Sequence, residues 1–176
     1  MRIYGNRQIK TLPGKKTRPT TARVREALFN IWQGRIEGCR WLDLCAGSGS
    51  MGAEALCRGA AAVTGIEKNP RACAIIKDNW QRVVGEGQSF TILRSDLVKH
   101  LKSMERQEFD RIYFDPPYNS GLYGPVLEAI SDAGLLASGG EIAVEGGRSL
   151  WVPLSIPRLE ICREKVYGNT ILTFYC

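Results

Sequence analysis

The tetrapeptide Asp115-Pro116-Pro117-Tyr118 follows the apolar run 111–114, and its residue types suit a site that holds a planar amino group. The exocyclic amine of a nucleic-acid base is a weak nucleophile, because its lone pair is delocalised into the ring, so a catalyst must orient it. The Asp115 carboxylate and the Pro116 carbonyl can each accept one N–H, while the prolines remove competing donors. Tyr118 offers a flat face for stacking. A stiff proline turn with a buried tyrosine would have the same sequence, so the tetrapeptide alone leaves both interpretations open.

A glycine loop lies upstream, between an apolar run at 41–46 and a helix-prone stretch at 53–58. Its spacing fits G-x-G-x-x-G, in which small residues let the backbone approach a ligand and aim a helix N-terminus at it. The motif is a weak signal by itself, because many nucleotide-binding folds contain it. The predicted cofactor contacts in this region are Asp43, Ala46, Gly47, Ser48, Gly49 and Gly52.

Two further predicted strand ends carry acids. Glu67 follows the apolar run 62–66, where a carboxylate can accept hydrogen bonds from both hydroxyls of a ribose. Asp96, with Leu97 next to it, follows the run 90–94, where a carboxylate can accept from an adenine amine. Polar groups at three successive strand ends predict a site for a nucleoside cofactor.

In chain order, the glycine loop, Glu67, Asp96 and the Asp-Pro-Pro-Tyr turn resemble the class I S-adenosylmethionine-dependent amino-methyltransferases. Three further segments extend the match over nearly the whole chain, at 18–21 (RPTT), 24–31 (VREALFNI) and 167–170 (YGNT). With them the chain is similar to the bacterial RsmD-type 16S ribosomal RNA guanine-N2 methyltransferases. The resemblance implies transfer of one methyl group to the 2-amino group of guanine 966 of that RNA.

The resemblance also implies how the ligands are held. The methionine part of S-adenosylmethionine would lie near Asp43 and the glycine loop, its ribose on Glu67 and its adenine near Asp96. A guanine extruded from the RNA would stack on Tyr118 and present its amine to Asp115. The implied partner is 16S ribosomal RNA or a small-subunit assembly particle, and a monomer is the expected state.

The positive charge is concentrated at the N-terminus. Residues 1–25 hold eight of the 24 basic residues and none of the 18 acidic ones, so the remainder has 16 basic and 18 acidic residues. A basic arm of this kind is typical of a phosphate-binding element, although a solvated tail has the same composition. The candidates for RNA contact are Arg2, Lys15, Lys16, Arg18 and Arg25.

The length predicts one methyltransferase domain over residues 1–176, with its RNA-contacting arm at 1–25. The six cysteines show neither Cys-x-x-Cys spacing nor a paired histidine, so we expect neither a metal site nor a disulfide framework. Cys45 is expected inside a buried strand, and Cys57 and Cys73 are expected on helices, as small packed residues.

Free thiols suit the reducing cytoplasm, which is the expected location. The first residues lack the apolar segment of a secretion signal, and no stretch approaches the roughly 18 apolar residues of a membrane span. The sequence therefore predicts neither secretion nor insertion into a membrane.

Helix signals occur at two places. Thr20 or Thr21 can cap a helix whose apolar residues at 24, 27, 28, 31 and 32 recur at helical spacing. Asn69 and Pro70 have the residue types of a helix start. Trp80 falls on the apolar face of that second helix, where we expect it in the core.

Strand and helix signals alternate along the middle of the chain, which predicts a parallel, doubly wound sheet. Strands at 141–145, 159–165 and 170–175 follow, and the last two are joined by residues 167–169. These two strands predict an antiparallel hairpin. With the resemblance, the expected fold is a Rossmann-like α/β fold whose seven-stranded sheet is mostly parallel and ends in this hairpin.

Other functions remain open at this stage. A dinucleotide-dependent dehydrogenase uses the same glycine spacing with an acid after its second strand, but it gives the turn at 115–118 no role. A noncatalytic RNA-binding module could retain the whole fold. Within the methyltransferases, enzymes that act on DNA adenine, on another RNA or on a protein amide share the Pro-Pro turn.

Overall fold

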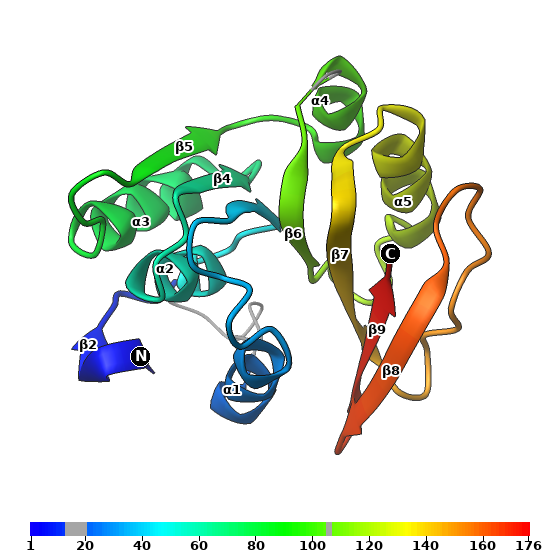
Figure 1. Ribbon diagram of the computed structural model, residues 1–176, viewed down its shortest axis with the longest axis horizontal. Helices are drawn as coiled ribbons and strands as arrows, with labels where there is room; N and C mark the ends of the chain where they lie inside the picture. The colour runs from blue at the N-terminus through cyan, green and yellow to red at the C-terminus, as the bar shows by residue number, and fades with distance from the viewer. Residues whose placement is uncertain (13–20, 105–106) are drawn as a thin grey trace.

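A computed structural model describes residues 1–12, 21–104 and 107–176 of the chain (Figure 1). Its centre is a seven-stranded sheet with the strand order β5-β4-β3-β6-β7-β9-β8. The strands are β3 (Arg40–Leu44), β4 (Ala62–Ile66), β5 (Ser89–Leu93), β6 (Phe109–Phe114), β7 (Leu136–Gly147), β8 (Ile161–Tyr167) and β9 (Thr170–Tyr175). The strands from β5 to β7 pair in parallel, and β9 is antiparallel to both β7 and β8. The predicted α/β fold with an antiparallel C-terminal hairpin is confirmed.

Helices cover both faces of this sheet (Figure 1). They are α1 (Ala22–Ile31), α2 (Ser50–Cys57), α3 (Pro70–Gln81), α4 (Leu97–Ser103) and α5 (Tyr123–Asp132). Neighbouring residues of β3 enter two separate apolar clusters, because side chains alternate between the faces of a strand. Trp41 packs in the cluster of α1, α2 and α3, whereas Leu42 and Leu44 pack in the cluster of α4 and α5. The sheet is therefore doubly wound, as predicted.

Side-chain caps fix where the helices start. Thr21 Oγ1 accepts a hydrogen bond from Val24 N at 3.3 Å, and Asn69 Oδ1 accepts one from Arg71 N at 2.9 Å. Asp96 caps α4 in the same way. Each cap satisfies a backbone N–H that has no partner within the helix. The cap predicted at Thr20 or Thr21 is Thr21, and the helix start predicted at Asn69 is confirmed.

The strand before the glycine loop is shorter than expected. β3 ends at Leu44, two residues before the end of the apolar run 41–46. Cys45 follows with a φ of 60° and a half-buried side chain. The prediction that Cys45 lies inside a buried strand is therefore wrong, because the backbone turns out of the sheet there to begin the loop. Cys57 and Cys73 lie on α2 and α3, as predicted.

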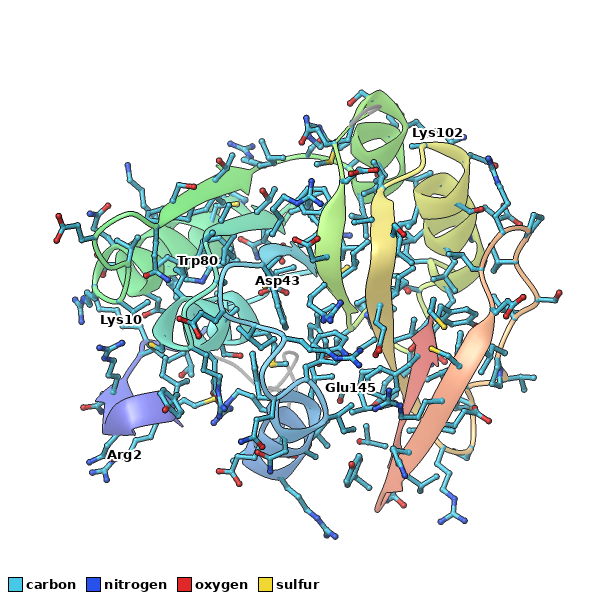
Figure 2. The ribbon with its side chains drawn as sticks, viewed as in Figure 1. Arg2, Lys10, Asp43, Trp80, Lys102 and Glu145 are labelled. Carbon is cyan, nitrogen blue, oxygen red and sulfur yellow. The ribbon has the colours of Figure 1, made fainter. Side chains whose placement is uncertain are left out.

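Trp80 packs the glycine loop against the sheet (Figure 2). Its ring is fully buried, and its Nε1 donates to Gly49 O at 2.7 Å. A Cβ added at Gly52 would lie 2.3 Å from this ring, and one added at Gly65 of β4 would lie 2.6 Å from it. The glycine spacing therefore serves close packing beneath the loop, and the prediction of Trp80 as a core residue is confirmed.

The first twelve residues form a packed segment. The short strands β1 (Arg2–Ile3) and β2 (Arg7–Gln8) pair around the 3-10 turn η1 (Tyr4–Asn6). Ile3 and Ile9 are buried in the same cluster as α1 and α2. A free solvated tail is therefore wrong for this part of the arm. Three of the predicted RNA-contact residues lie outside the described residues: Lys15, Lys16 and Arg18.

Candidate active site

A cavity of about 680 Å³, here called the strand-end cavity, lies at the carboxyl ends of β3, β4, β5 and β6. Open α/β sheets bind ligands at this edge, in the crevice formed by the loops that follow the strands. The structure thus brings together residues predicted from separate parts of the sequence. Those lining the cavity are Asp43, Ala46, Gly47, Ser48, Glu67, Asp96, Leu97, Asp115, Pro116, Pro117 and Tyr118.

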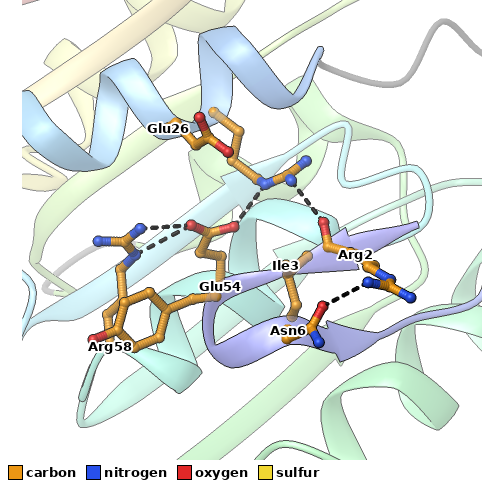
Figure 3. A pocket seen from close by; sticks show the side chains of 8 residues that line it. Arg2, Ile3, Asn6, Glu26, Glu54 and Arg58 are labelled. Carbon is orange, nitrogen blue, oxygen red and sulfur yellow. Dashed lines mark hydrogen bonds and ion pairs between the residues drawn. The ribbon is translucent and has the colours of Figure 1, made fainter.

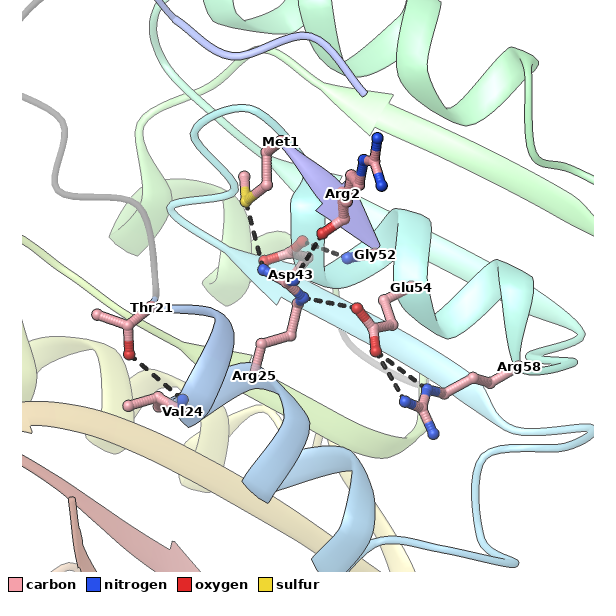
Figure 4. Close-up of polar contacts among 9 residues, drawn as sticks. All are labelled: Met1, Arg2, Thr21, Val24, Arg25, Asp43, Gly52, Glu54 and Arg58. Atoms are coloured by element: carbon pink, nitrogen blue, oxygen red, sulfur yellow. Dashed lines mark hydrogen bonds and ion pairs between the residues drawn. The ribbon is translucent and has the colours of Figure 1, made fainter. Parts of the chain in front are cut away.

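Two predicted cofactor residues, Gly49 and Gly52, are not among the residues that line the cavity. Gly49 is the N-cap of α2 with a φ of 71°, a conformation that favours glycine. Gly52 N donates to Asp43 Oδ2 at 2.9 Å (Figure 4). Gly49 therefore shapes the start of the helix and Gly52 holds Asp43, and neither residue lines the cavity.

Glu67 organises the glycine loop from the neighbouring strand. Its Oε2 accepts from Gly47 N at 3.0 Å, and its Oε1 accepts from Asn69 N at 2.8 Å. Gly47 has a φ of 58°, again in the region that favours glycine. Because both oxygens of Glu67 are held by backbone N–H groups, its carboxylate is already in place at the cavity wall.

Asp43 is the most deeply buried acid of the cavity, with 1% of its surface exposed. Burial raises the pKa of this carboxyl to about 8, against a lowering by the Gly52 N–H, and the nearby Glu67 charge raises it further. Desolvation disfavours the charged form of an acid. Asp43 therefore keeps its proton to a higher pH than an ordinary aspartate does.

The Asp-Pro-Pro-Tyr turn forms one wall of the cavity. Asp115 is half-buried and Pro116 is buried. The half-buried Tyr118 ring packs on Gly147, the last residue of β7. A Cβ added at Gly147 would lie only 3.1 Å from two carbon atoms of the ring. Gly147 thus lets the ring lie close to the backbone. Tyr118 lines the cavity and is not simply a buried tyrosine within a stiff turn.

Tyr113 and Glu145 are among the cavity residues that the sequence analysis did not predict. Glu145 of β7 is 3% exposed, and its Oε2 accepts a hydrogen bond from the hydroxyl of Tyr113 at 2.6 Å. Both residues line the cavity. The available signal was a single charged residue closing the apolar run 142–144, at the end of the strand next to the Asp115 turn.

The N-terminal segment also reaches the cavity, through Thr11 and Leu12. Asn79 of α3, which is fully buried, accepts from Lys10 N at 2.8 Å and donates to Lys10 O at 2.9 Å. The same side chain donates to Ser48 O of the glycine loop at 2.8 Å. Asn79 therefore ties residues 10–12 to the cofactor side of the cavity, a link that pattern analysis could not detect.

Arg25 corrects one part of the RNA-contact prediction. Its side chain is buried, and its Nε pairs with Glu54 Oε2 at 2.6 Å while Nη2 donates to Arg2 O at 2.8 Å (Figure 4). Glu54 also binds Arg58 at 2.8 Å. The prediction that Arg25 contacts phosphate is wrong for this structure, because the guanidinium is held inside the protein.

Arg2 keeps an exposed side chain, and its Nη1 donates to Asn6 Oδ1 at 3.0 Å. It lines a second hollow of about 420 Å³ between the N-terminal hairpin, α1 and α2 (Figure 3). Arg2 is therefore a predicted RNA-contact residue whose charge is exposed in the described part of the arm.

Acids dominate the strand-end cavity. Among the described residues that line it, Lys68 is accompanied by five carboxyl groups: Asp43, Glu67, Asp96, Asp115 and Glu145. Such a lining suits a ligand that carries positive charge and disfavours the pyrophosphate of a dinucleotide.

Burial raises the pKa of Cys45 to about 12, so this thiol stays protonated and is unsuited to act as a nucleophile. Within the described ranges, no group of three or more His, Cys, Asp or Glu side chains could hold a metal ion.

Comparison with known proteins identifies the family of the chain. The family model described as conserved hypothetical protein 95 matches residues 1–176. The chain is 34% identical to ribosomal RNA small subunit methyltransferase D of Escherichia coli, covering 90% of this chain and 78% of that protein. It is 32% identical to YlbH of Bacillus subtilis, covering 96% and 92%. The solved structure of yhhF from Escherichia coli superposes with a TM-score of 0.83 at 31% identity, covering 99% and 96%. The chain therefore belongs to the RsmD family, the family of conserved hypothetical protein 95. It is an S-adenosylmethionine-dependent methyltransferase.

Proposed function

We propose that this methyltransferase transfers a methyl group to the exocyclic 2-amino group of a guanine in 16S ribosomal RNA, at a position of the guanine 966 type. The observation that carries the proposal is the sharing of one cavity by the glycine loop and the Asp115–Tyr118 turn. A cofactor held by the first would lie next to an amine held by the second. Relatives named ribosomal RNA small subunit methyltransferase D support the choice of RNA.

The cavity fits S-adenosylmethionine in charge and in the order of its polar groups. Bound there, the cofactor supplies a methyl group already activated by a sulfonium. Glu67 would accept hydrogen bonds from the ribose hydroxyls and Asp96 from the adenine amine, with Leu97 next to Asp96 at the adenine end. The methionine part would be held by Asp43, Ala46, Gly47 and Ser48, which line the cavity, while Gly49 and Gly52 support this loop from beneath.

The Asp115 turn prepares the acceptor. Tyr118 stacks on the extruded guanine, Asp115 accepts one N–H of its amine, and the Pro116 carbonyl accepts the other. Pro117 keeps the turn rigid. Orientation of the amine supplies most of the catalysis, since a well-aligned pair of reactants needs no strong base. The amine proton becomes acidic only as the new C–N bond forms, so Asp115 or water takes it late.

The N-terminal arm places the RNA. Arg2, Lys15, Lys16 and Arg18 contact phosphates, and Thr11 and Leu12 of the same arm line the cavity. The working unit is a monomer with a single domain over residues 1–176, and its substrate is naked 16S RNA or an assembling small subunit.

Six free thiols fit a reducing cytoplasm. No helix of the described ranges is long and apolar enough to cross a membrane.

The test uses radiolabelled S-adenosylmethionine with purified small-subunit RNA or assembly particles. The RNA is digested afterwards, and the labelled nucleoside is identified. Labelled N2-methylguanosine at one position is the expected product. Retained cofactor binding without label in any RNA would overturn the proposal, and parallel reactions with DNA and with proteins would then identify the acceptor.

A further inference from the structure

Glu145 lies next to the catalytic turn at the strand ends. The parallel register pairs Phe114 of β6 with Val144 of β7, so the next residues, Asp115 and Glu145, are neighbours. Asp115 follows the end of β6, whereas Glu145 lies within β7. Both line the strand-end cavity. Because side chains alternate along a strand, Glu145 lies on the same face of β7 as Ala143, which pairs with Tyr113 of β6. Two carboxyl groups from adjacent strands thus face the same space.

The surroundings of Glu145 give it a defined orientation. Its side chain is 3% exposed, and burying a carboxylate is unfavourable unless hydrogen bonds satisfy it. Tyr113, itself buried, donates its hydroxyl to Glu145 Oε2 at 2.6 Å. This bond holds Oε2, and a carboxylate offers about four acceptor positions in all. Tyr113 is therefore a positioning residue for Glu145.

The Asp115 turn does not distinguish one base amine from another. Guanine, adenine and cytosine all carry an exocyclic NH₂ group, and a carboxylate with a carbonyl can hold any of them. The bases differ at the neighbouring ring nitrogen. Guanine has an N1–H donor beside its amine, whereas adenine N1 and cytosine N3 present a lone pair. Recognition of guanine therefore needs a second acceptor placed beside the first.

We propose that Glu145 is a specificity-determining residue, which accepts a hydrogen bond from guanine N1–H while Asp115 holds the 2-amino group. The inference rests on the proposed function and names how that site selects its base. A carboxylate in this place attracts N1–H and repels the lone pair of adenine or cytosine. Sites that hydrogen-bond a substrate group reject analogues lacking that group strongly, because the buried partner is left unpaired.

The experiment compares guanine with 2-aminopurine at the methylated position of a synthetic RNA. 2-Aminopurine keeps the 2-amino group, but its N1 has a lone pair and no hydrogen. For the unaltered protein, kcat/KM on 2-aminopurine RNA should be at least about 100-fold below that on guanine RNA. In Glu145→Gln, an amide NH₂ can donate to the lone pair. This variant should lose about 100-fold on guanine RNA and reverse the preference towards 2-aminopurine.

Glu141→Gln is the matched control. Glu141 lies on the same strand, is 6% exposed and accepts from Trp32 Nε1 at 2.8 Å, but it does not line the cavity. It should leave the ratio between the two RNAs unchanged. Glu145→Asp, which keeps the charge on a shorter side chain, should keep the guanine preference at a lower rate. Cofactor affinity, measured by calorimetry, shows that each variant is folded.

The two proposals can fail separately. If the unaltered protein labels no guanine at N2, the proposed function fails. If it labels guanine at N2 but accepts 2-aminopurine equally well, Glu145 does not select the base. The same conclusion follows if Glu145→Gln lowers both activities by the same factor, because a purely structural role would have that effect.

Discussion

Asn79 binds the backbone of Lys10 as a neighbouring strand would, accepting from its N–H at 2.8 Å and donating to its carbonyl at 2.9 Å. The second amide hydrogen donates to Ser48 O in the glycine loop at 2.8 Å. One buried side chain therefore joins the N-terminal arm to the cofactor loop. Binding of the cofactor and ordering of the arm near the cavity are expected to favour each other through this contact.

Asn79→Ala should lower the free energy of unfolding by about 2–4 kcal/mol, because it leaves three partly buried backbone groups without their partners. It should also weaken cofactor binding, since Ser48 loses its support. Urea unfolding and calorimetric titration of S-adenosylmethionine measure both effects. Asn69→Ala on the same helix removes only an exposed cap and should cost about 1 kcal/mol. Equal losses in the two variants would contradict the linking role of Asn79.

Gly52→Ala should destabilise the protein, although alanine normally favours a helix over glycine by about 0.5–1 kcal/mol. The new methyl group would lie 2.3 Å from Trp80, a fully buried ring that cannot move aside. Gly124→Ala in α5 is the control, because its added Cβ meets only Leu154 at an ordinary 3.7 Å. Thermal unfolding should show a lower Tm for the first variant and an equal or higher Tm for the second. A stabilised Gly52→Ala protein would refute the packing argument.

Much of the fold could be predicted because local signals agree with it. Thr21 and Asn69 have the residue types of helix caps, and alternating strands and helices require parallel pairing. The strand-end acids could be found for the same reason, since the carboxyl ends of parallel strands meet at one edge. Asp43, Glu67 and Asp115 accordingly line one cavity.

The features that could not be predicted from the sequence depend on contacts between residues far apart in the chain. The sequence predicts Arg25 as an exposed cation on a helix, but the Glu54 carboxylate, 29 residues further along the chain, holds its guanidinium inside the protein. The Tyr113–Glu145 bond and the Asn79–Lys10 pair likewise join separate elements. The spacing of residues within one helix or strand carries no information about such partners. The concentration of basic residues in 1–25 therefore predicted RNA contact for the arm without showing that Arg25 is buried.

Asp43 should make stability depend on pH. Its pKa in the folded protein is about 8, above the ordinary 3.8, so between these values the folded state holds a proton that the unfolded state releases. Stability should therefore fall as the pH rises through this window, by at most about 1.4 kcal/mol per pH unit. The asparagine of Asp43→Asn does not titrate, so the variant does not lose stability as the pH rises through this window. Its stability relative to the unaltered protein should therefore increase with pH and level off above about pH 8.

Urea unfolding at several pH values tests this prediction. Asp110→Asn is the control with the opposite sign, because a hydrogen bond from Arg40 lowers the pKa of Asp110. The stability from Asp110 is present above its unfolded pKa and is lost as the pH falls through its lower folded pKa. Parallel stability curves for Asp43→Asn and the unaltered protein would show that Asp43 is not protonated in the folded state.

Arg25→Ala should lower the free energy of unfolding by about 3–5 kcal/mol, because it leaves part of the buried Glu54 carboxylate uncompensated. Arg23→Ala, at an exposed position of the same helix, should change it by less than about 0.5 kcal/mol. Chemical unfolding gives both values. RNA binding by Arg25→Ala should keep the salt dependence of the unaltered protein. A flatter dependence with unchanged stability would restore the phosphate contact to Arg25.

Asp115→Ala and Glu67→Ala should affect methyl transfer in different ways, because the two acids serve different ligands in one cavity. Asp115→Ala should lower kcat by about 100-fold or more, since the amine loses its orientation, while the Kd for S-adenosylmethionine stays nearly unchanged. Glu67→Ala should raise that Kd by about 10- to 100-fold, because the ribose and the N–H groups of Gly47 and Asn69 lose their acceptor. Single-turnover rates at saturating cofactor separate the two effects: Glu67→Ala should recover most of its rate under these conditions, and Asp115→Ala should recover none. A fully active Asp115→Ala protein would contradict the role of the turn, and an unchanged Kd in Glu67→Ala would show that the ribose is held elsewhere.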